Sequence, residues 1–184
     1  MALELTSFSP VVQAVLASRL NHTLPLVRGG ACASGDLQSL QRLKPAELFP
    51  VGRHPEAALS GLFLYLDCWD ASHELSQGIA SPEGSYWHGI AHRMEPDAGN
   101  ALYWFRKVGA HPVFPALHTE AGAILNLHRP TGWRLASQHW DPFLFIDWCE
   151  QARTSGGTAE VQTARAIQTA EWRLMFEWCG KSHA

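Results

Sequence analysis

The sequence has no run of basic residues. It carries 14 lysines and arginines against 17 aspartates and glutamates, which gives a formal net charge of -3 over 184 residues. Binding to nucleic acid or to an anionic membrane surface needs clustered positive charge. We therefore expect neither a nucleic acid nor a membrane among the partners of this chain.

Long apolar runs are missing as well. No stretch approaches the roughly 18 consecutive apolar residues of a membrane-spanning helix. The first ten residues, MALELTSFSP, contain Glu4 and show no basic segment ahead of an apolar core, so they do not resemble a secretion signal. These two absences predict a cytoplasmic protein.

Cysteine is scarce and scattered. The four cysteines, Cys32, Cys68, Cys149 and Cys179, form no C-x-x-C pair. This spacing indicates neither a zinc ribbon nor a thioredoxin-like redox pair. We expect four buried thiols, which fits a reducing cytosol.

Strand patterns are also lacking, because no segment alternates polar and apolar residues over more than about four positions. Apolar residues recur instead at helical spacing between capping serines, aspartates and prolines. A chain of 184 residues fits one domain by the usual figure of about 100–200 residues per domain. We predict an all-α, single-domain protein (1–184), an irregular bundle of about six to seven helices.

The expected helices differ in length and are separated by one long irregular arm. The arm, residues 22–55, is rich in glycine and proline and holds one short helix near 37–43. We expect the main helices over 10–20, where Asn21 ends the first, and over 56–77, 82–94, 98–108, 115–127, 142–153 and 159–179.

Histidines concentrate in the centre of the chain. His88 and His92 are four residues apart and share one helix face, with Glu95 one turn further along. If helices 56–77 and 82–94 fold back on each other, His73 comes opposite His88 and Asp70 comes near His92. This set suits a divalent metal such as zinc or non-haem iron with an open position for water. We expect His73, His88, His92 and Asp70 as candidate ligands.

The same stretch also offers candidates for catalysis. In a metal-assisted hydrolase, Glu95 would act as base on the bound water, and Asn100 with Arg106 would orient a small anionic or amide-bearing substrate. Gly89 stands where the H-E-x-x-H zinc proteases carry their glutamate, so peptidase chemistry of that type is not expected.

Two elements of this region carry a resemblance. SHELSQ (72–77) and GSYWHGIAHRMEPDAGNALYWFRKVGAHPVF (84–114) resemble a family of bacterial and fungal proteins that share S-H-x-x-S-Q and W-H-x-I-x-H-R-x-E-x-D-x-x-N-A-x-Y-W. Met94 departs from the family, which often has arginine there. The resemblance supplies no reaction but implies a shared polar constellation: His73, His88, His92, Arg93, Glu95, Asp97, Asn100 and Arg106.

A different class of function fits the same residues. Gly89, Ala101, Phe105, Val108 and Pro112 stand close to the spacing of one tetratricopeptide-like helical hairpin, although no repeat at that period is visible. In this alternative the protein is a non-enzymatic ligand-binding or protein-interaction module, and its histidines are hydrogen-bonded packing residues. The sequence leaves the oligomeric state open.

Overall fold

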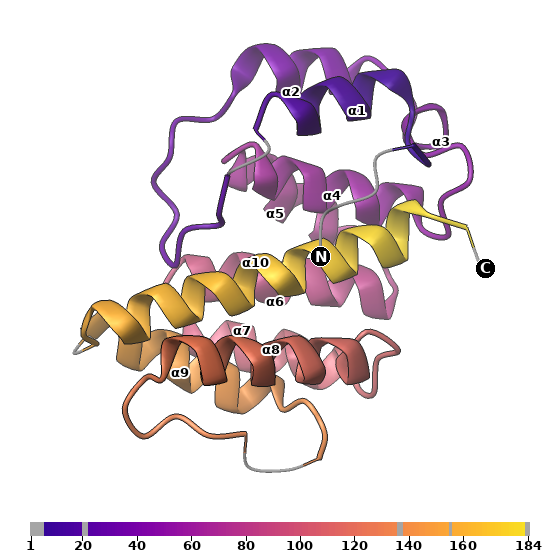
Figure 1. Ribbon diagram of the computed structural model, residues 1–184. Helices are drawn as coiled ribbons and strands as arrows, with labels where there is room; N and C mark the ends of the chain where they lie inside the picture. The colour runs from indigo at the N-terminus through magenta and orange to yellow at the C-terminus, as the bar shows by residue number, and fades with distance from the viewer. Residues whose placement is uncertain (1–5, 20–21, 136–137, 155, 183–184) are drawn as a thin grey trace.

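The computed structural model describes residues 6–19, 22–135, 138–154 and 156–182, and every regular element within these ranges is a helix. The fold is therefore all-α, as predicted, but the described residues form ten helices where we expected six or seven (Figure 1). They are α1 (Pro10–Ala17), α2 (Ser34–Gln41), α3 (Pro45–Leu48), α4 (Pro55–Tyr65), α5 (Trp69–Gln77), α6 (Pro82–Met94), α7 (Ala98–Val108), α8 (Phe114–His128), α9 (Pro142–Thr154) and α10 (Thr158–Gly180).

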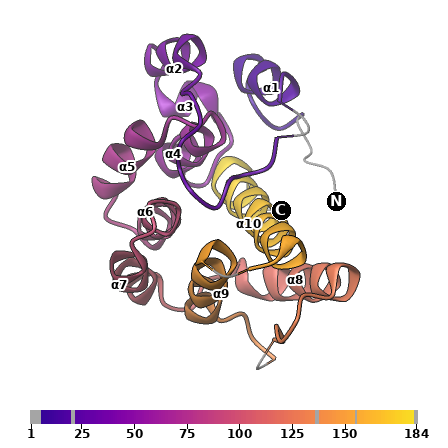
Figure 2. The same ribbon diagram turned by 90° about the vertical axis from the view of Figure 1, so that its left-hand side faces the viewer.

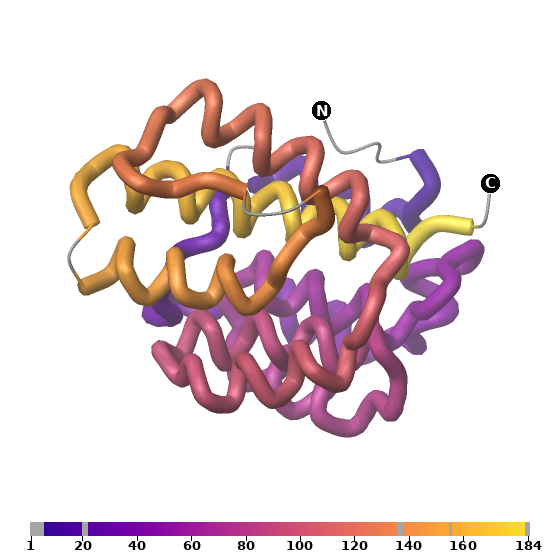
Figure 3. Tube along the Cα trace, turned by 90° about the horizontal axis from the view of Figure 1, so that it is seen from below, coloured from indigo at the N-terminus to yellow at the C-terminus, as the bar shows by residue number. Residues whose placement is uncertain are grey.

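Helix α10 holds the two halves of the chain together. It lies between the N-terminal helices and α8 (Figure 1), with α4 against one side and α8 and α9 against the other. Figure 2 shows the same arrangement after a 90° turn, with α10 between α4 and α8. Figure 3, seen from below, shows α8 and α9 on either side of α10. The helix is apolar over more than one face, with Ile167, Trp172 and Phe176 buried, which is typical of a helix enclosed by its neighbours.

Helix α6 is enclosed to the same degree. Every residue from Glu83 to Met94 is buried, and the helix packs against α4, α5 and α7. Its close contact with α7 depends on Gly89, because a Cβ there would lie 2.9 Å from the ring of Phe105. Buried polar side chains need partners inside the protein, so His88, His92 and Arg93 must each be paired within the fold.

The predicted helix 56–77 is wrong as a single element, because the chain breaks between α4 and α5. Asp67 adopts a positive φ of 59°, a left-handed conformation that aspartate tolerates better than most residues. Arg19 donates to the Asp67 carboxylate, and His22 lies 3.7 Å from it. The break changes the direction of the chain before α5, the helix that carries His73.

The predicted arm, residues 22–55, is more structured than expected. It contains α2 and α3 and buries Leu40, Leu48 and Phe49 in the core. Close to α5 it runs as a short segment, Arg28–Ala33, which we call the strap. The strap is fixed at both ends, since the Arg28 N–H donates to the Met94 carbonyl at 2.8 Å and the Ala33 N–H donates to the Leu66 carbonyl at 3.1 Å.

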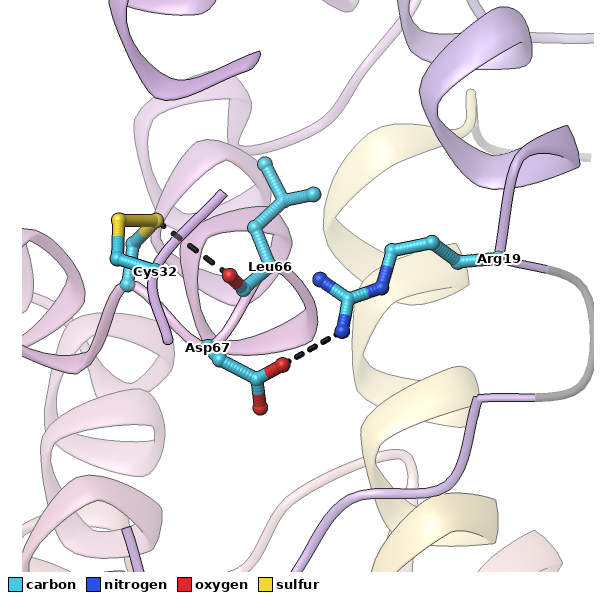
Figure 4. The surroundings of a disulfide bond; sticks show 5 residues. Arg19, Cys32, Leu66 and Asp67 are labelled. Carbon is cyan, nitrogen blue, oxygen red and sulfur yellow. Dashed lines mark hydrogen bonds and ion pairs between the residues drawn. A yellow bond between two sulfur atoms is a disulfide. The ribbon is translucent and has the colours of Figure 1, made fainter. Parts of the chain in front are cut away.

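A disulfide also fixes the strap, so the expectation of four free thiols is wrong. Cys32 in the strap bonds to Cys68 at the start of α5 (Figure 4), while Cys149 and Cys179 are free and buried. Short cysteine motifs such as C-x-x-C do not reveal this pair, because its two cysteines are 36 residues apart. Figure 4 shows the bond beside the Arg19–Asp67 ion pair, so two long-range links meet at the α4–α5 break.

The remaining boundaries follow the predictions with small shifts. Helix α1 stops at Ala17, earlier than expected, and the predicted end at Asn21 lies outside the described residues. Helices α6 and α7 have the predicted bounds, because the Ser81 and Asp97 side chains accept hydrogen bonds from Gly84 N–H and Asn100 N–H. Among the helices described, none has the length and apolar character needed to cross a membrane.

Candidate functional site

Helices α5 and α6 bring three imidazoles together. The short connection after α5 turns the chain back, so His73 lies opposite His88 as the hairpin argument predicted. The ring of His73 lies 4.2 Å from that of His88 and 5.1 Å from that of His92. One nitrogen from each ring falls within 4.8 Å of the other two. We call these three residues the histidine cluster.

The hydrogen bonds of Ser76 favour one tautomer of His88. The Ser76 hydroxyl donates to the His73 carbonyl at 3.1 Å, so its oxygen is left to accept. That oxygen lies 3.0 Å from His88 Nδ1. This arrangement favours the tautomer of His88 with its proton on Nδ1, in which the lone pair on Nε2 faces into the histidine cluster.

His92 lies between that lone pair and two carboxylates. Its Nε2 is 3.1 Å from His88 Nε2, and its Nδ1 is 3.5 Å from Glu95 and 4.0 Å from Asp97. The Nδ1 atom is buried and makes no hydrogen bond within the described chain. A neutral imidazole has one N–H, so His92 cannot satisfy both sides.

Each position of the His92 proton leaves one unfavourable contact. A proton on Nε2 satisfies His88 but turns the Nδ1 lone pair toward carboxylate oxygens. A proton on Nδ1 satisfies Glu95 but leaves two Nε2 lone pairs facing each other at 3.1 Å. A cation between the two Nε2 atoms would resolve the conflict, since both lone pairs then become ligands.

The separation of the two Nε2 atoms suits such an ion. Zinc binds imidazole nitrogen at about 2.0–2.1 Å, so two tetrahedral ligands lie about 3.3 Å apart. The observed 3.1 Å is close to this value. The ligand nitrogen of His73, within 4.8 Å of the other two, would have to approach by about 1 Å to reach the same ion.

The protonation of the cluster favours ligation. Burial lowers the pKa of His88 to about 4, with His73 and His92 adding to the effect. Burial and the neighbouring His73 also lower the pKa of His92, although Asp97 and Glu95 oppose the shift. Both rings are therefore neutral at pH 7, which is the form that binds metals.

Two tryptophans hold the rings in place. Trp69 stacks on His73 with an interplanar angle of 19° and donates its indole N–H to the Ala91 carbonyl at 2.8 Å. Trp104 of α7 lies 4.2 Å from the His88 ring. The ammonium group of Lys107 lies 4.2 Å from the centre of the Trp104 ring, which gives this side of the cluster a positive charge.

The strap reaches the cluster through Arg28. Its guanidinium lies over Trp69 at 4.0 Å and pairs with Asp70 at 3.2 Å and with Glu95 at 3.6 Å. The Asp70 side chain is 96% exposed and turned toward Arg28, so the structure does not bring Asp70 to the three histidines. The expectation that Asp70 lies near His92 is therefore wrong, because Asp70 pairs with Arg28 instead.

Glu95 is also held on two sides. One oxygen faces His92 Nδ1 and the other faces Arg28. This geometry suits a residue that orients His92 better than a base that takes a proton from bound water, the role the sequence assigned to it.

Within the part of the chain that the structure describes, neither of the two substrate-orienting candidates has a hydrogen bond or ion pair with the three histidines. Asn100 is exposed, and its side-chain amide donates to Asp97 at 2.6 Å. Arg106 lines a different cavity together with His111 and Trp140. Met94, the departure from the family pattern, is buried in the hydrophobic core.

Sequence reasoning missed five residues of this site: Ser76, Trp104, Lys107, Arg28 and Trp69. Ser76 and Trp104 both stood in the quoted motifs, and the helical periods 73/76 and 100/104/107 would have placed Ser76, Trp104 and Lys107 beside the cluster. The position of Arg28 had no local signal, because the strap is placed by the disulfide and by backbone contacts. Comparison of the chain with protein-family models, curated proteins and solved structures finds no match.

Proposed function

We propose that the histidine cluster binds a divalent transition metal, zinc first among them, and that the metal activates a water molecule for hydrolysis. The observation that carries the proposal is the pair of Nε2 atoms 3.1 Å apart, together with the buried Nδ1 of His92 facing two carboxylates. A carboxylate that holds the outer nitrogen of a ligating histidine is a common feature of metal sites.

In this proposal the ligands are His73, His88 and His92. Three imidazoles leave the fourth position of a tetrahedral ion for water, as in catalytic zinc sites. The metal supplies the activation, because it lowers the pKa of its bound water to about 7. Ser76 and Glu95 orient His88 and His92, and Lys107 offers a positive charge to an anionic small-molecule substrate.

The direct experiment is metal analysis. Protein purified without a histidine tag and equilibrated with zinc should retain one equivalent, and cobalt in its place should give the visible spectrum of a tetrahedral site. The double variant His88→Ala/His92→Ala should lose both signals. His118→Ala, on α8, is the matched control and should keep them. Absence of retained metal from the unmodified protein would contradict the proposal.

The hydrolytic step needs its own assay. The zinc-loaded unmodified protein should hydrolyse an activated ester such as p-nitrophenyl acetate. Zinc-loaded His118→Ala should hydrolyse it at the same rate, because His118 takes no part in the proposed reaction. The double variant should show the background rate. Stoichiometric zinc binding without hydrolysis would leave a metal-binding protein and remove the enzymatic role.

The alternative function, a non-enzymatic interaction module, has one observation in its favour. The tight contact of Gly89 with Phe105 explains these two residues of the tetratricopeptide-like pattern by packing alone. His92→Ala separates the two functions: an unfolding free energy lower by several kcal/mol favours a structural histidine, and unchanged or higher stability favours a functional one.

The cytoplasmic location stays a prediction. It depended in part on four free thiols, and the Cys32–Cys68 disulfide removes that support. Cytosolic thiol pools keep most such pairs reduced, so the disulfide counts in favour of an oxidising compartment.

A further inference from the structure

A second cavity lies on the opposite side of α7 from the histidine cluster. Successive residues of a helix are about 100° apart around its axis, so Arg106 points about 200° away from Trp104. Trp104 contacts His88, whereas Arg106 lines a cavity of about 740 Å³. Pockets of about 300–1,000 Å³ are typical of small-molecule sites.

The walls of this cavity are mainly rings. It lies between the end of α7, the turn into α8 and the segment that leads into α9. Four aromatic side chains contribute, Phe105, Phe114, Trp140 and Phe143, with prolines at the starts of α8 and α9. Phe143 is 36% exposed, so one wall of the cavity carries an aromatic ring that is partly open to solvent. Such walls favour a flat apolar ligand, because stacked and edge-to-face ring pairs are favourable beyond the area that they bury.

The charges of the lining favour an anion. Asp141 is the one carboxylate of the lining, and it caps α9 by accepting from the N–H groups of Phe143 and Leu144 at 2.9 and 3.2 Å. Arg106 makes no ion pair with a described residue, and its guanidinium lies 5.9 Å from the centre of the Phe143 ring. The acid is thus used within the fold while the guanidinium remains available at the mouth.

We propose that this cavity binds a small aromatic carboxylate, with its ring between the aromatic walls and its carboxylate on Arg106. Guanidinium and carboxylate form paired, charge-assisted hydrogen bonds, and the arginine at the mouth allows the charged group of the ligand to stay near water. The inference is independent of the metal chemistry proposed for the histidine cluster.

Matched probes test the proposal on the full chain. We would titrate 2-naphthoate, its uncharged isostere 2-naphthamide and the flexible anion octanoate, each followed by calorimetry. Naphthoate should bind about tenfold more tightly than naphthamide, since a hydrogen bond to a charged group contributes about 1.5 kcal/mol or more. Naphthoate should also bind more tightly than octanoate.

Two variants locate the effect. Arg106→Gln should reduce naphthoate binding to the level of naphthamide, and Arg42→Gln, an exposed arginine at the end of α2, should change nothing. Phe143→Ala should weaken both naphthyl probes alike. Equal binding of naphthoate and naphthamide, tighter binding of octanoate, or an unchanged Arg106→Gln variant would each overturn the proposal, as would the absence of any binding.

Discussion

Replacing Glu171 by glutamine should destabilise the protein more than any surface charge change, because it leaves a buried arginine without its counter-charge. Arg93 of α6 and Glu171 of α10 are both fully buried and form a two-point ion pair. Gln168 accepts from Arg93 Nε at 3.1 Å, and the Tyr86 hydroxyl donates to Glu171 at 3.1 Å. Burial is the largest single influence and opposes the charge on Arg93, but the charge and hydrogen bond of Glu171, together with Cys149 and Tyr86, raise the Arg93 pKa.

The magnitude follows from the burial of both partners. Removing one member of a buried ion pair costs about 3–5 kcal/mol, because the other charge stays in a medium that solvates it poorly. For a chain of this length each kcal/mol lowers the melting temperature by about 2–4 °C, so Glu171→Gln should melt about 10 °C lower. The Asp70→Asn change is the control: that carboxylate is exposed and pairs with Arg28, and such pairs contribute about 0–1 kcal/mol.

A double-mutant cycle tests the reasoning by urea denaturation with the disulfide intact. Arg93→Met combined with Glu171→Leu should cost less than the sum of the two single changes by about 2 kcal/mol or more. Its remaining cost comes from Tyr86 and Gln168, which lose their partners. If Glu171→Gln costs less than about 1 kcal/mol, or if the two single changes add, the pair does not stabilise the contact between α6 and α10.

Three further outcomes can be measured on the same preparations. Burial lowers the pKa of His111 from 6.5 to about 4. The neutral form of His111 therefore stabilises the fold above pH 6.5, and this contribution is lost as the pH falls toward 4. His111→Gln should flatten the fall in melting temperature between pH 7 and pH 5. Gly61→Ala should cost about 1–3 kcal/mol in chemical denaturation, because its Cβ would lie 2.5 Å from the Trp87 ring, whereas Gly35→Ala, with open space around it, should not destabilise. Ser76→Ala should weaken zinc binding about 10-fold by calorimetry, since it frees the His88 ring that Ser76 orients; an unchanged zinc affinity would remove Ser76 from the site.

The elements that the sequence predicted well are those with local causes. Helices α6 and α7 begin where Ser81 and Asp97 cap them, and a cap is readable within four residues. The antiparallel hairpin of α5 and α6 also has a local cause, the short connection between them, and this placed His73 opposite His88.

Some of the wrong predictions have long-range causes. The break between α4 and α5 depends on Asp67, which is held by Arg19, 48 residues away in sequence. Arg106 is a different kind of error, because the helical period already separates it from the face of α7 that carries Asn100, Trp104 and Lys107. A site proposed from a motif is therefore improved by assigning each motif residue to a helix face before it is given a role.

The strap connects the disulfide to the histidine cluster. Cys32 and Cys68 close a loop across a separation of 36 residues, and Arg28 at the start of the strap contacts Trp69 and Glu95. Trp69 stacks on His73, and Glu95 faces His92. Fixing the strap therefore limits the motion of residues that orient two of the three proposed ligands.

The double variant Cys32→Ser/Cys68→Ser should show two separate effects. Loop entropy for a separation of 36 residues predicts a loss of about 4 kcal/mol of stability. Zinc affinity should fall by about 3- to 10-fold, less than the 10–100-fold effect of a residue that touches a ligand directly. Arg28→Ala, which keeps the disulfide, should reproduce the affinity change without the large loss of stability. If the cysteine variant melts earlier yet binds zinc as tightly as the unmodified protein, the disulfide acts on the fold alone and Arg28 does not transmit its effect to the ligands.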